Sequence, residues 1–180
     1  MIPRSLLAAA LAAGIAAFSI PAVGAELSVP EPLAAAHEEL YSNLQAATQK
    51  PGRTGEAATA AMRVLAPHFE KEEQFALPQL GLLPTLAGPP LSAGQADLTP
   101  ELRNELIART DRLRSELPQM LAEHKEIEAA LDNMEKAATA ENQQDVAELA
   151  REIGTHAKEE ELILYPAALL AGEYAKQQQR

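Results

Sequence analysis

The sequence predicts an all-α protein, an antiparallel four-helix bundle made of two equivalent helical hairpins, with a long loop and helix inserted between the second and third helices. Three observations favour this class. The composition is rich in Ala, Leu, Glu and Gln, which favour helix, and poor in the β-branched residues typical of sheets. Apolar residues recur at helical spacing in several long segments. A string of His, Glu and Pro also occurs twice, which indicates a duplicated unit.

The first two helices are expected at about residues 32–49 and 54–77. Pro32 suits the first turn of a helix, where a missing N–H costs nothing. The segment KPGR at residues 50–53 is typical of a turn and separates the two helices. These two helices form the first predicted hairpin.

The second hairpin is expected from about residue 99 to residue 164. Thr99 and Pro100 predict a helix start, with a capping hydroxyl followed by a first-turn proline. This third helix should run to about residue 138 and be kinked or split at Pro118. Asn142 is expected to cap a fourth helix, and residues 167–174 should add a short tail helix.

Between the hairpins, residues 78–98 are rich in Pro, Gly and Leu. A connection of this length is unusual in a compact domain. Because it is apolar, we expect it to lie against the bundle. Residues 78–117 are therefore interpreted as an insertion into one domain that spans residues 26–180.

Residues 1–25 have the pattern of a secretory signal peptide. A basic start ending at Arg4 is followed by an apolar run and by small residues before Glu26, so cleavage is expected after Ala25. An uncleaved membrane anchor is the alternative, but the apolar run is shorter than the roughly 20 residues that a spanning helix needs. The mature protein is thus expected to be periplasmic or secreted, without a membrane attachment.

The net charge narrows the range of partners. It is −11 for the whole chain and −12 once Arg4 is removed with the first 25 residues. A strongly acidic surface disfavours binding to nucleic acid and to anionic membranes. The chain has no cysteine, so its stability must come from the core or from a bound metal.

The chain has four histidines, and their spacing is regular: His37 and His68 are 31 residues apart, and His124 and His156 are 32 apart. Counted from the predicted turns, all four lie at similar depth in the bundle. His68 and His156 each begin the string H-x3-E-E-x4-P. The matched depth predicts that the four imidazoles meet.

Glu72 and Glu160, four residues after these histidines, lie on the same helical stripe, which Phe75 and Ile163 extend. Buried carboxylates and imidazoles are costly without partners, so the pattern predicts a metal site, for which iron, manganese and zinc are all suitable. A single H-x3-E is more often a hydrogen-bonded pair, but two copies at matched depth favour metal in a bundle core.

The neighbouring acids have a simpler explanation. The second glutamates of the two strings, Glu73 and Glu161, are expected to be solvated or to form ion pairs with Lys71 and Lys158.

The order H…H-x3-E…H…H-x3-E resembles the hemerythrin-like (HHE cation-binding) family over about residues 33–170, whereas the Glu-x-x-His motif of ferritin-like di-iron proteins is missing. The resemblance implies a non-haem centre of two iron ions. It implies that His37 and His68 bind one iron, that His124 and His156 bind the other, and that Glu72 and Glu160 bridge them.

The sequence departs from the oxygen-carrying hemerythrins, which have a fifth histidine one turn from the third-helix histidine. Here Met120 and Glu128 flank His124, and the last motif ends in Glu160 at +4 rather than in aspartate at +5. Glu128 is either an additional ligand or an exposed helix acid. Tyr41 and Tyr165 are either hydrogen-bond partners of the centre or core residues with a solvated hydroxyl.

These features predict an exported protein that binds dioxygen, nitric oxide or peroxide at a His/Glu di-iron centre, for storage, sensing or scavenging. Two alternatives stay open at this point. One is a di-iron redox enzyme that acts on peroxide or nitric oxide. The other is a structural bundle that holds zinc or no metal.

Overall fold

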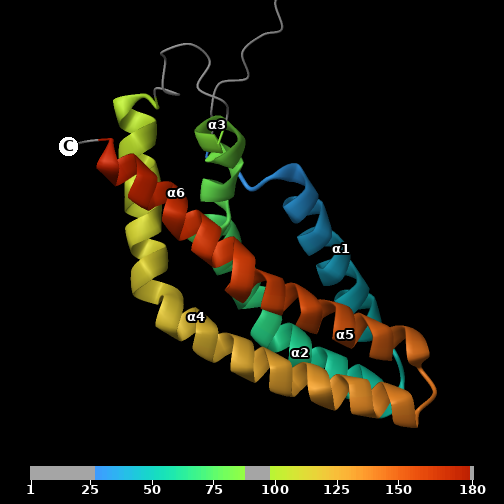
Figure 1. The fold of residues 1–180 in the computed structure, drawn as a ribbon. Coiled ribbons are helices and arrows are strands. Elements are labelled where there is room, and N and C mark those ends of the chain that lie inside the picture. Colours follow the sequence, from blue (N-terminus) through green and yellow to red (C-terminus); the bar gives the residue numbers. More distant parts are fainter. Residues whose placement is uncertain (1–26, 88–97, 179–180) are drawn as a thin grey trace, which may run out of the picture.

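The computed structural model describes residues 27–87 and 98–178, and these residues are almost entirely helical, with no β-strand among them. The expected signal peptide lies outside the described ranges. Four helices pack in a closed ring, α1 on α2, α2 on α4, α4 on α5 and α5 on α1, so they form a helical bundle (Figure 1). Their bounds are α1 (Glu31–Ala47), α2 (Gly52–Lys71), α4 (Pro100–Ala140) and α5 (Gln144–Glu159). Within the described residues, no helix combines the length and apolar character needed to cross a membrane.

The helix ends agree with the sequence signals in one case and differ in another. Thr99 Oγ1 accepts a hydrogen bond from the Leu102 backbone N–H at 3.2 Å, so the predicted cap of the third helix is confirmed. Asn142 does not cap α5. It has a φ of 58° in the turn, which asparagine tolerates better than most residues, and Gln143 precedes the helix instead.

Pro118 neither splits nor ends its helix. α4 is continuous over 41 residues, and Figure 1 shows that it bends between its yellow and its gold parts. The bend is expected, because a proline ring crowds the preceding turn and removes one helical hydrogen bond. Leu113 and Met120, on either side of the proline, are both fully buried, so packing holds the two parts of the helix together.

Both H-x3-E-E-x4-P strings end in the same unusual structure. α2 continues into the π-helix η1 (Glu72–Ala76), and α5 continues into the π-helix η3 (Glu160–Leu164). Each π-helix begins at a +4 glutamate and ends two positions before a proline, whose ring would collide with the carbonyl four residues earlier in an α-helix. The wider turn gives that carbonyl room, and in η1 the Gln74 carbonyl accepts a hydrogen bond from Arg109 at 3.1 Å.

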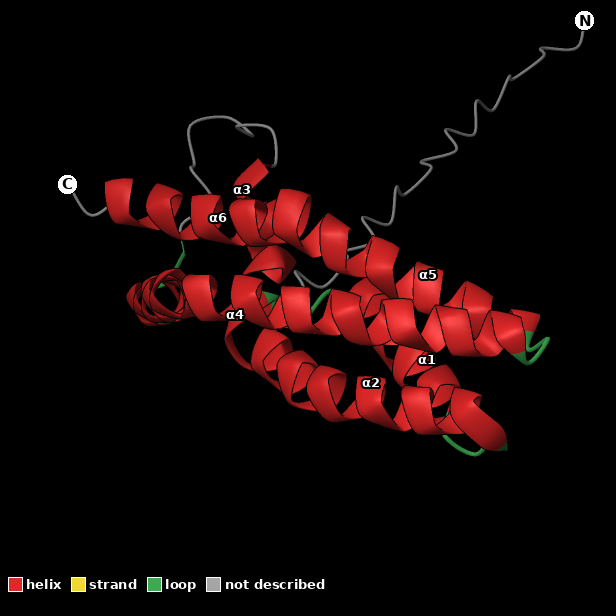
Figure 2. Ribbon diagram, turned by 90° about the horizontal axis from the view of Figure 1, so that it is seen from below, coloured by secondary structure: helices red, strands yellow, loops and turns green. Residues whose placement is uncertain are grey.

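The region after η1 is helical rather than a loop as far as residue 87. It forms the 3-10 helix η2 (Pro78–Leu82) and the short helix α3 (Leu83–Ala87), with Leu80 and Leu82 buried. The next ten residues lie outside the described ranges. α6 (Tyr165–Gln177) continues from η3 and packs on α4 and η2, so α5, η3 and α6 form one long run in Figure 2.

Two apolar clusters frame the histidines. One lies within the four-helix ring and includes Phe69, and the other lies towards η2 and α6 and includes Tyr165. The His37 ring stacks on Phe69 with 4.6 Å between centroids, and the His124 ring stacks on Tyr165 at 5.7 Å. The imidazoles therefore lie between the two parts of the core.

Candidate metal centre

The structure brings together the side chains that the sequence singles out. Each helix of the ring contributes one histidine, and each π-helix contributes its first glutamate. All six side chains are at most 11% exposed. We call them the His/Glu cluster: His37, His68, Glu72, His124, His156 and Glu160.

Within the described residues, the possible ligand atoms fall into two groups that share Glu160. One group is His68, Glu72, His124 and Glu160, and the other is His37, His156 and Glu160, with the atoms of each group within 4.8 Å of one another. The rings therefore do not group as the implied pairs, His37 with His68 and His124 with His156. The reason is that rings meet across the α2–α4 and α1–α5 interfaces rather than within a hairpin.

The two carboxylates each face both groups. Glu160 Oε1 lies 3.0 Å from His156 Nε2 and 3.3 Å from His37 Nε2, and its Oε2 lies 3.5 Å from His124 Nε2. Glu72 Oε1 lies 3.4 Å from His68 Nε2, and its Oε2 lies 3.9 Å from His37 Nε2. Each glutamate thus turns one oxygen to each group.

Two further carboxylates, Glu123 and Glu161, orient the rings, and we call them the outer carboxylates. His68 Nδ1 donates to Glu123 Oε2 at 2.9 Å, and His124 Nδ1 donates to Glu161 Oε1 at 2.8 Å. A carboxylate can only accept, so Nδ1 of each ring carries the hydrogen. When both rings are neutral, the Nε2 lone pairs of His68 and His124 face each other at 2.7 Å, an arrangement that a bound cation would relieve.

Glu123 was not predicted as part of the site, because no spacing rule connects it with His68, 55 residues earlier. The expectation that Glu161 is solvated or paired with a lysine is corrected by its hydrogen bond from His124. The second glutamates of both strings have related positions. Glu161 contacts the histidine of α4, whereas Glu73, 54% exposed, lies 3.8 Å from Nδ1 of His37 on α1.

The electrostatics of the cluster favour bound cations. Burial and the neighbouring charge of Glu160 raise the pKa of Glu72. Burial also raises the pKa of Glu160, but hydrogen bonds from His156 and His37 outweigh it and hold that pKa well below its usual value. Glu72 Oε2 is buried without a hydrogen-bond partner, so the donor set fits a metal.

The pKa values of His68 and His156 shift in the direction opposite to the effect of burial. Burial lowers the pKa of His68, but its hydrogen bond to Glu72 and the charge of that residue outweigh the effect and raise it. Burial likewise lowers the pKa of His156, but the adjacent Glu160 carboxylate outweighs this effect and raises it. Without a metal, the buried negative charge therefore retains protons on the rings.

Tyr165 belongs to this centre, and Tyr41 does not contact it. The Tyr165 side chain is 1% exposed, its hydroxyl donates to Glu72 Oε1, and Oη lies 3.3 Å from His68 Nε2 and 3.2 Å from His124 Nε2. Burial and the charges of Glu72 and Glu160 raise the pKa of this phenol far above its usual value. Tyr41 is 42% exposed on α1.

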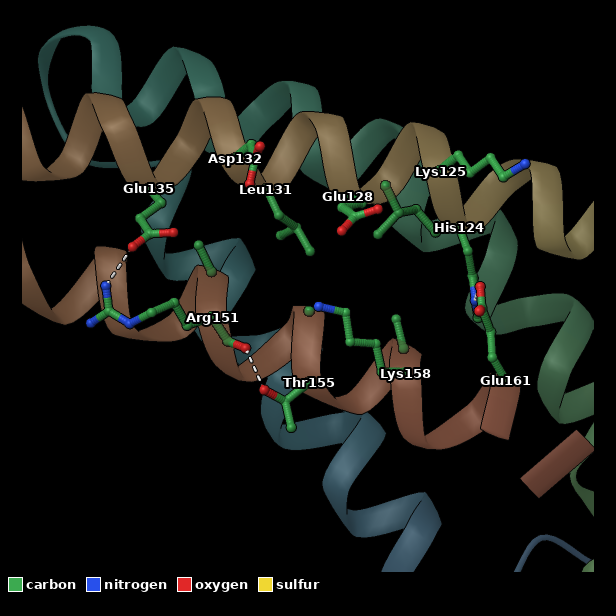
Figure 3. A pocket seen from close by; sticks show the side chains of 14 residues that line it. His124, Lys125, Glu128, Leu131, Asp132, Glu135, Arg151, Thr155, Lys158 and Glu161 are labelled. Atoms are coloured by element: carbon green, nitrogen blue, oxygen red, sulfur yellow. Dashed lines mark hydrogen bonds and ion pairs between the residues drawn. The ribbon is translucent and has the colours of Figure 1, made fainter. Parts of the chain in front are cut away.

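Three surface grooves reach the cluster, and the smallest, of about 220 Å³, lies between α2 and α4 and reaches His68. A cavity of about 430 Å³ between α4 and α5 ends at His124 and Glu161 (Figure 3). Glu128 lines this cavity as an exposed side chain near Lys158, and the structure does not bring it into either ligand group. A second cavity, of about 650 Å³, lies between α1 and α5 and reaches His156.

Comparison with known proteins gives one match. The family model of the hemerythrin HHE cation binding domain matches residues 33–168, a range that contains the whole His/Glu cluster and both π-helices. No curated protein and no solved structure matches the chain.

Proposed function

Because the chain belongs to the hemerythrin HHE cation-binding family, we propose that its His/Glu cluster holds two iron ions and binds a small ligand: dioxygen, nitric oxide or peroxide. One observation carries the proposal. The Nδ1 atoms of His68 and His124 donate to the outer carboxylates, so each ring leaves its Nε2 atom for a metal, and these two Nε2 atoms converge at 2.7 Å. Such a pair needs a cation.

The carboxylates support two ions rather than one. Glu72 and Glu160 each direct one oxygen to the His68/His124 group and the other to the His37/His156 group. Two carboxylates that divide their oxygens in this way would bridge a pair of ions. Their negative charges also offset part of the positive charge of that pair.

The donor set supports iron. Each group offers two imidazoles with carboxylate oxygens, and the chain has no cysteine for a closed zinc–thiolate site. Iron held by two imidazoles and carboxylates keeps open coordination positions, which is the chemistry that binding of a small ligand requires. The protein's own residues orient the rings through the outer carboxylates and surround the centre with apolar side chains.

The test is to load the chain that begins at Glu26 with ferrous iron without oxygen, then measure metal content and the visible spectrum. We expect two irons per chain and a reversible spectral change when dioxygen or nitric oxide is added. The variants His68→Ala and Glu160→Ala should lose iron, whereas Glu128→Ala, at an exposed acid of the nearby groove, should keep it.

Two results would contradict this proposal. If the chain binds zinc but no iron, the centre is structural. If the loaded protein reduces peroxide or nitric oxide over many turnovers with a chemical reductant, it is a redox enzyme rather than a binding protein.

We also propose that the protein acts outside the cytoplasm. The support is the signal-peptide pattern of residues 1–25. In cells that express the full chain, the exported fraction should contain a protein that begins at Glu26, as measured by mass spectrometry. Full-length protein confined to the cytoplasmic fraction would refute export.

A further inference from the structure

We propose that Tyr165 supplies its phenol oxygen as a ligand to the metal ion held by His68 and His124. The two halves of the centre would then differ, because one ion has an additional protein oxygen and the other has an open position. This inference rests on the proposed metal centre and assigns a ligand outside its histidines and glutamates.

The position of the hydroxyl is the first argument. Ligand atoms about 2.1 Å from one ion, at angles of about 90° to 109°, are separated by about 3.0–3.4 Å. Tyr165 Oη lies 3.3 Å from His68 Nε2 and 3.2 Å from His124 Nε2. It therefore keeps the spacing that ligand atoms of one ion keep from one another.

The number of hydrogens is the second argument. The hydroxyl has one hydrogen, and Glu72 Oε1 accepts it. In the neutral rings that metal binding requires, Nε2 of His68 and Nε2 of His124 carry no hydrogen, so three acceptors face a single hydrogen. An ion among these atoms removes the conflict, because it binds both nitrogens and the oxygen. The phenol proton is released to solvent as the oxygen–metal bond forms, and no electron is transferred.

The Glu72 carboxylate can give up its hydrogen bond from the Tyr165 hydroxyl when the oxygen–metal bond forms. Its Oε1 accepts from the hydroxyl, but its Oε2 is buried without a hydrogen-bond partner. Tyr165 itself is held in place, because its side chain is 1% exposed and its ring stacks on His124 with an angle of 29° between the planes. The phenol oxygen is thus held beside the expected metal position before any metal binds.

The internal repeat shows why only one half has this ligand. Tyr165 directly precedes Pro166 in the second string, and Leu77 directly precedes Pro78 in the first. Both side chains are buried and follow a π-helix, so they occupy equivalent positions. By the symmetry of the repeat, the half with His37 and His156 corresponds to the apolar Leu77 rather than to a phenol. The groove between α1 and α5 reaches this half at His156, which is where we expect the exogenous ligand to bind.

The test compares Tyr165→Phe with Tyr41→Phe, an exposed tyrosine one turn from His37. Each protein is loaded with iron, oxidised, and examined for iron content, for visible absorption and for resonance Raman vibrations of a phenolate bound to ferric iron. We expect the phenolate signals in the unchanged chain and in Tyr41→Phe. Tyr165→Phe should bind iron and lose these signals completely. Iron-loaded unchanged chain without phenolate vibrations would overturn the inference and leave Tyr165 as a hydrogen-bond donor to Glu72.

A zinc titration followed by ultraviolet difference absorption separates this inference from the proposed function. Formation of one tyrosinate per chain on zinc binding, lost in Tyr165→Phe and kept in Tyr41→Phe, would support the ligand even if the chain binds no iron. Zinc binding without tyrosinate formation would refute the ligand while leaving a metal centre. If neither metal binds, both proposals fail. Circular dichroism of Tyr165→Phe checks that the helices are intact.

Discussion

Glu123 allows the contribution of the outer carboxylates to be measured, and the informative change is Glu123→Gln. The carboxylate accepts from His68 Nδ1 through Oε2, and from Lys71 and Gln119 through Oε1. A glutamine has one acceptor oxygen, so it cannot serve both His68 and Lys71. One of these donors would face the amide NH2 group. The His68 ring would then lose the bond that keeps its hydrogen on Nδ1 and its Nε2 free for a metal.

Loss of such an outer hydrogen bond typically lowers metal affinity by about 10–100-fold, or about 1.4–2.8 kcal/mol. We expect a value in this range, because the Nδ1–Oε2 bond is short. Burial raises the pKa of Glu123, but the Lys71 and His68 bonds outweigh burial and hold this pKa at about 2. The assay is competition for the metal against a chelator of known affinity. Glu126→Gln is the control, since it removes the same charge from an exposed residue of the same helix and groove. Equal affinities for the two variants would refute the role given to Glu123.

Two further predictions concern packing and pH. Gly172→Ala should lower Tm by several degrees, because the added Cβ would lie 2.4 Å from Thr110 Cβ and force α6 away from α4, at a cost of about 1–3 kcal/mol; Gly154→Ala, with 4.0 Å to its nearest neighbour, should not lower it. The increase in Tm that bound metal produces should shrink as pH falls through the raised pKa values of His68 and His156, which lie above 6.5, because metal competes with protons for both rings. The metal-free protein should show the opposite trend: the stabilising charge on these histidines is fully present below pH 6.5 and is lost as pH rises through the raised pKa. Thermal unfolding over a pH series, with and without metal, measures both effects, and a metal-induced increase that is independent of pH would contradict the second prediction.

The sequence predicted the helical class and the convergence of the His/Glu cluster, because helical rise and period determine depth and face. It could not predict which rings pair. Which imidazoles pair depends on which helices pack side by side in the bundle, whereas the repeat suggested pairing within each hairpin. Helix propensity also does not distinguish an α-turn from a π-turn before a proline, so the ends of α2 and α5 were missed.

The repeat led to one wrong expectation, that equivalent positions of the two strings are equally buried. Ile163 occupies the same place in its string as Phe75, yet Ile163 is 60% exposed and Phe75 is 1% exposed. Phe75 packs with Leu80 and Leu113, both from the insertion, and the Arg112 guanidinium lies 4.4 Å from the centre of its ring. The insertion covers only the first string, so equivalence in sequence does not give equivalence in burial.

The two strings explain why a duplicated framework can hold an asymmetric centre. In each string the first glutamate belongs to the His/Glu cluster, and the second lies beside the histidine of the preceding helix of the ring. The copies then diverge at two points: Glu161 bonds His124 at 2.8 Å while Glu73 stays 3.8 Å from His37, and Tyr165 stands where the other copy has Leu77. Both differences give additional polar contacts to the half with His68 and His124. The half with His37 and His156 has fewer, so under the proposed function it is the half at which an external ligand would bind.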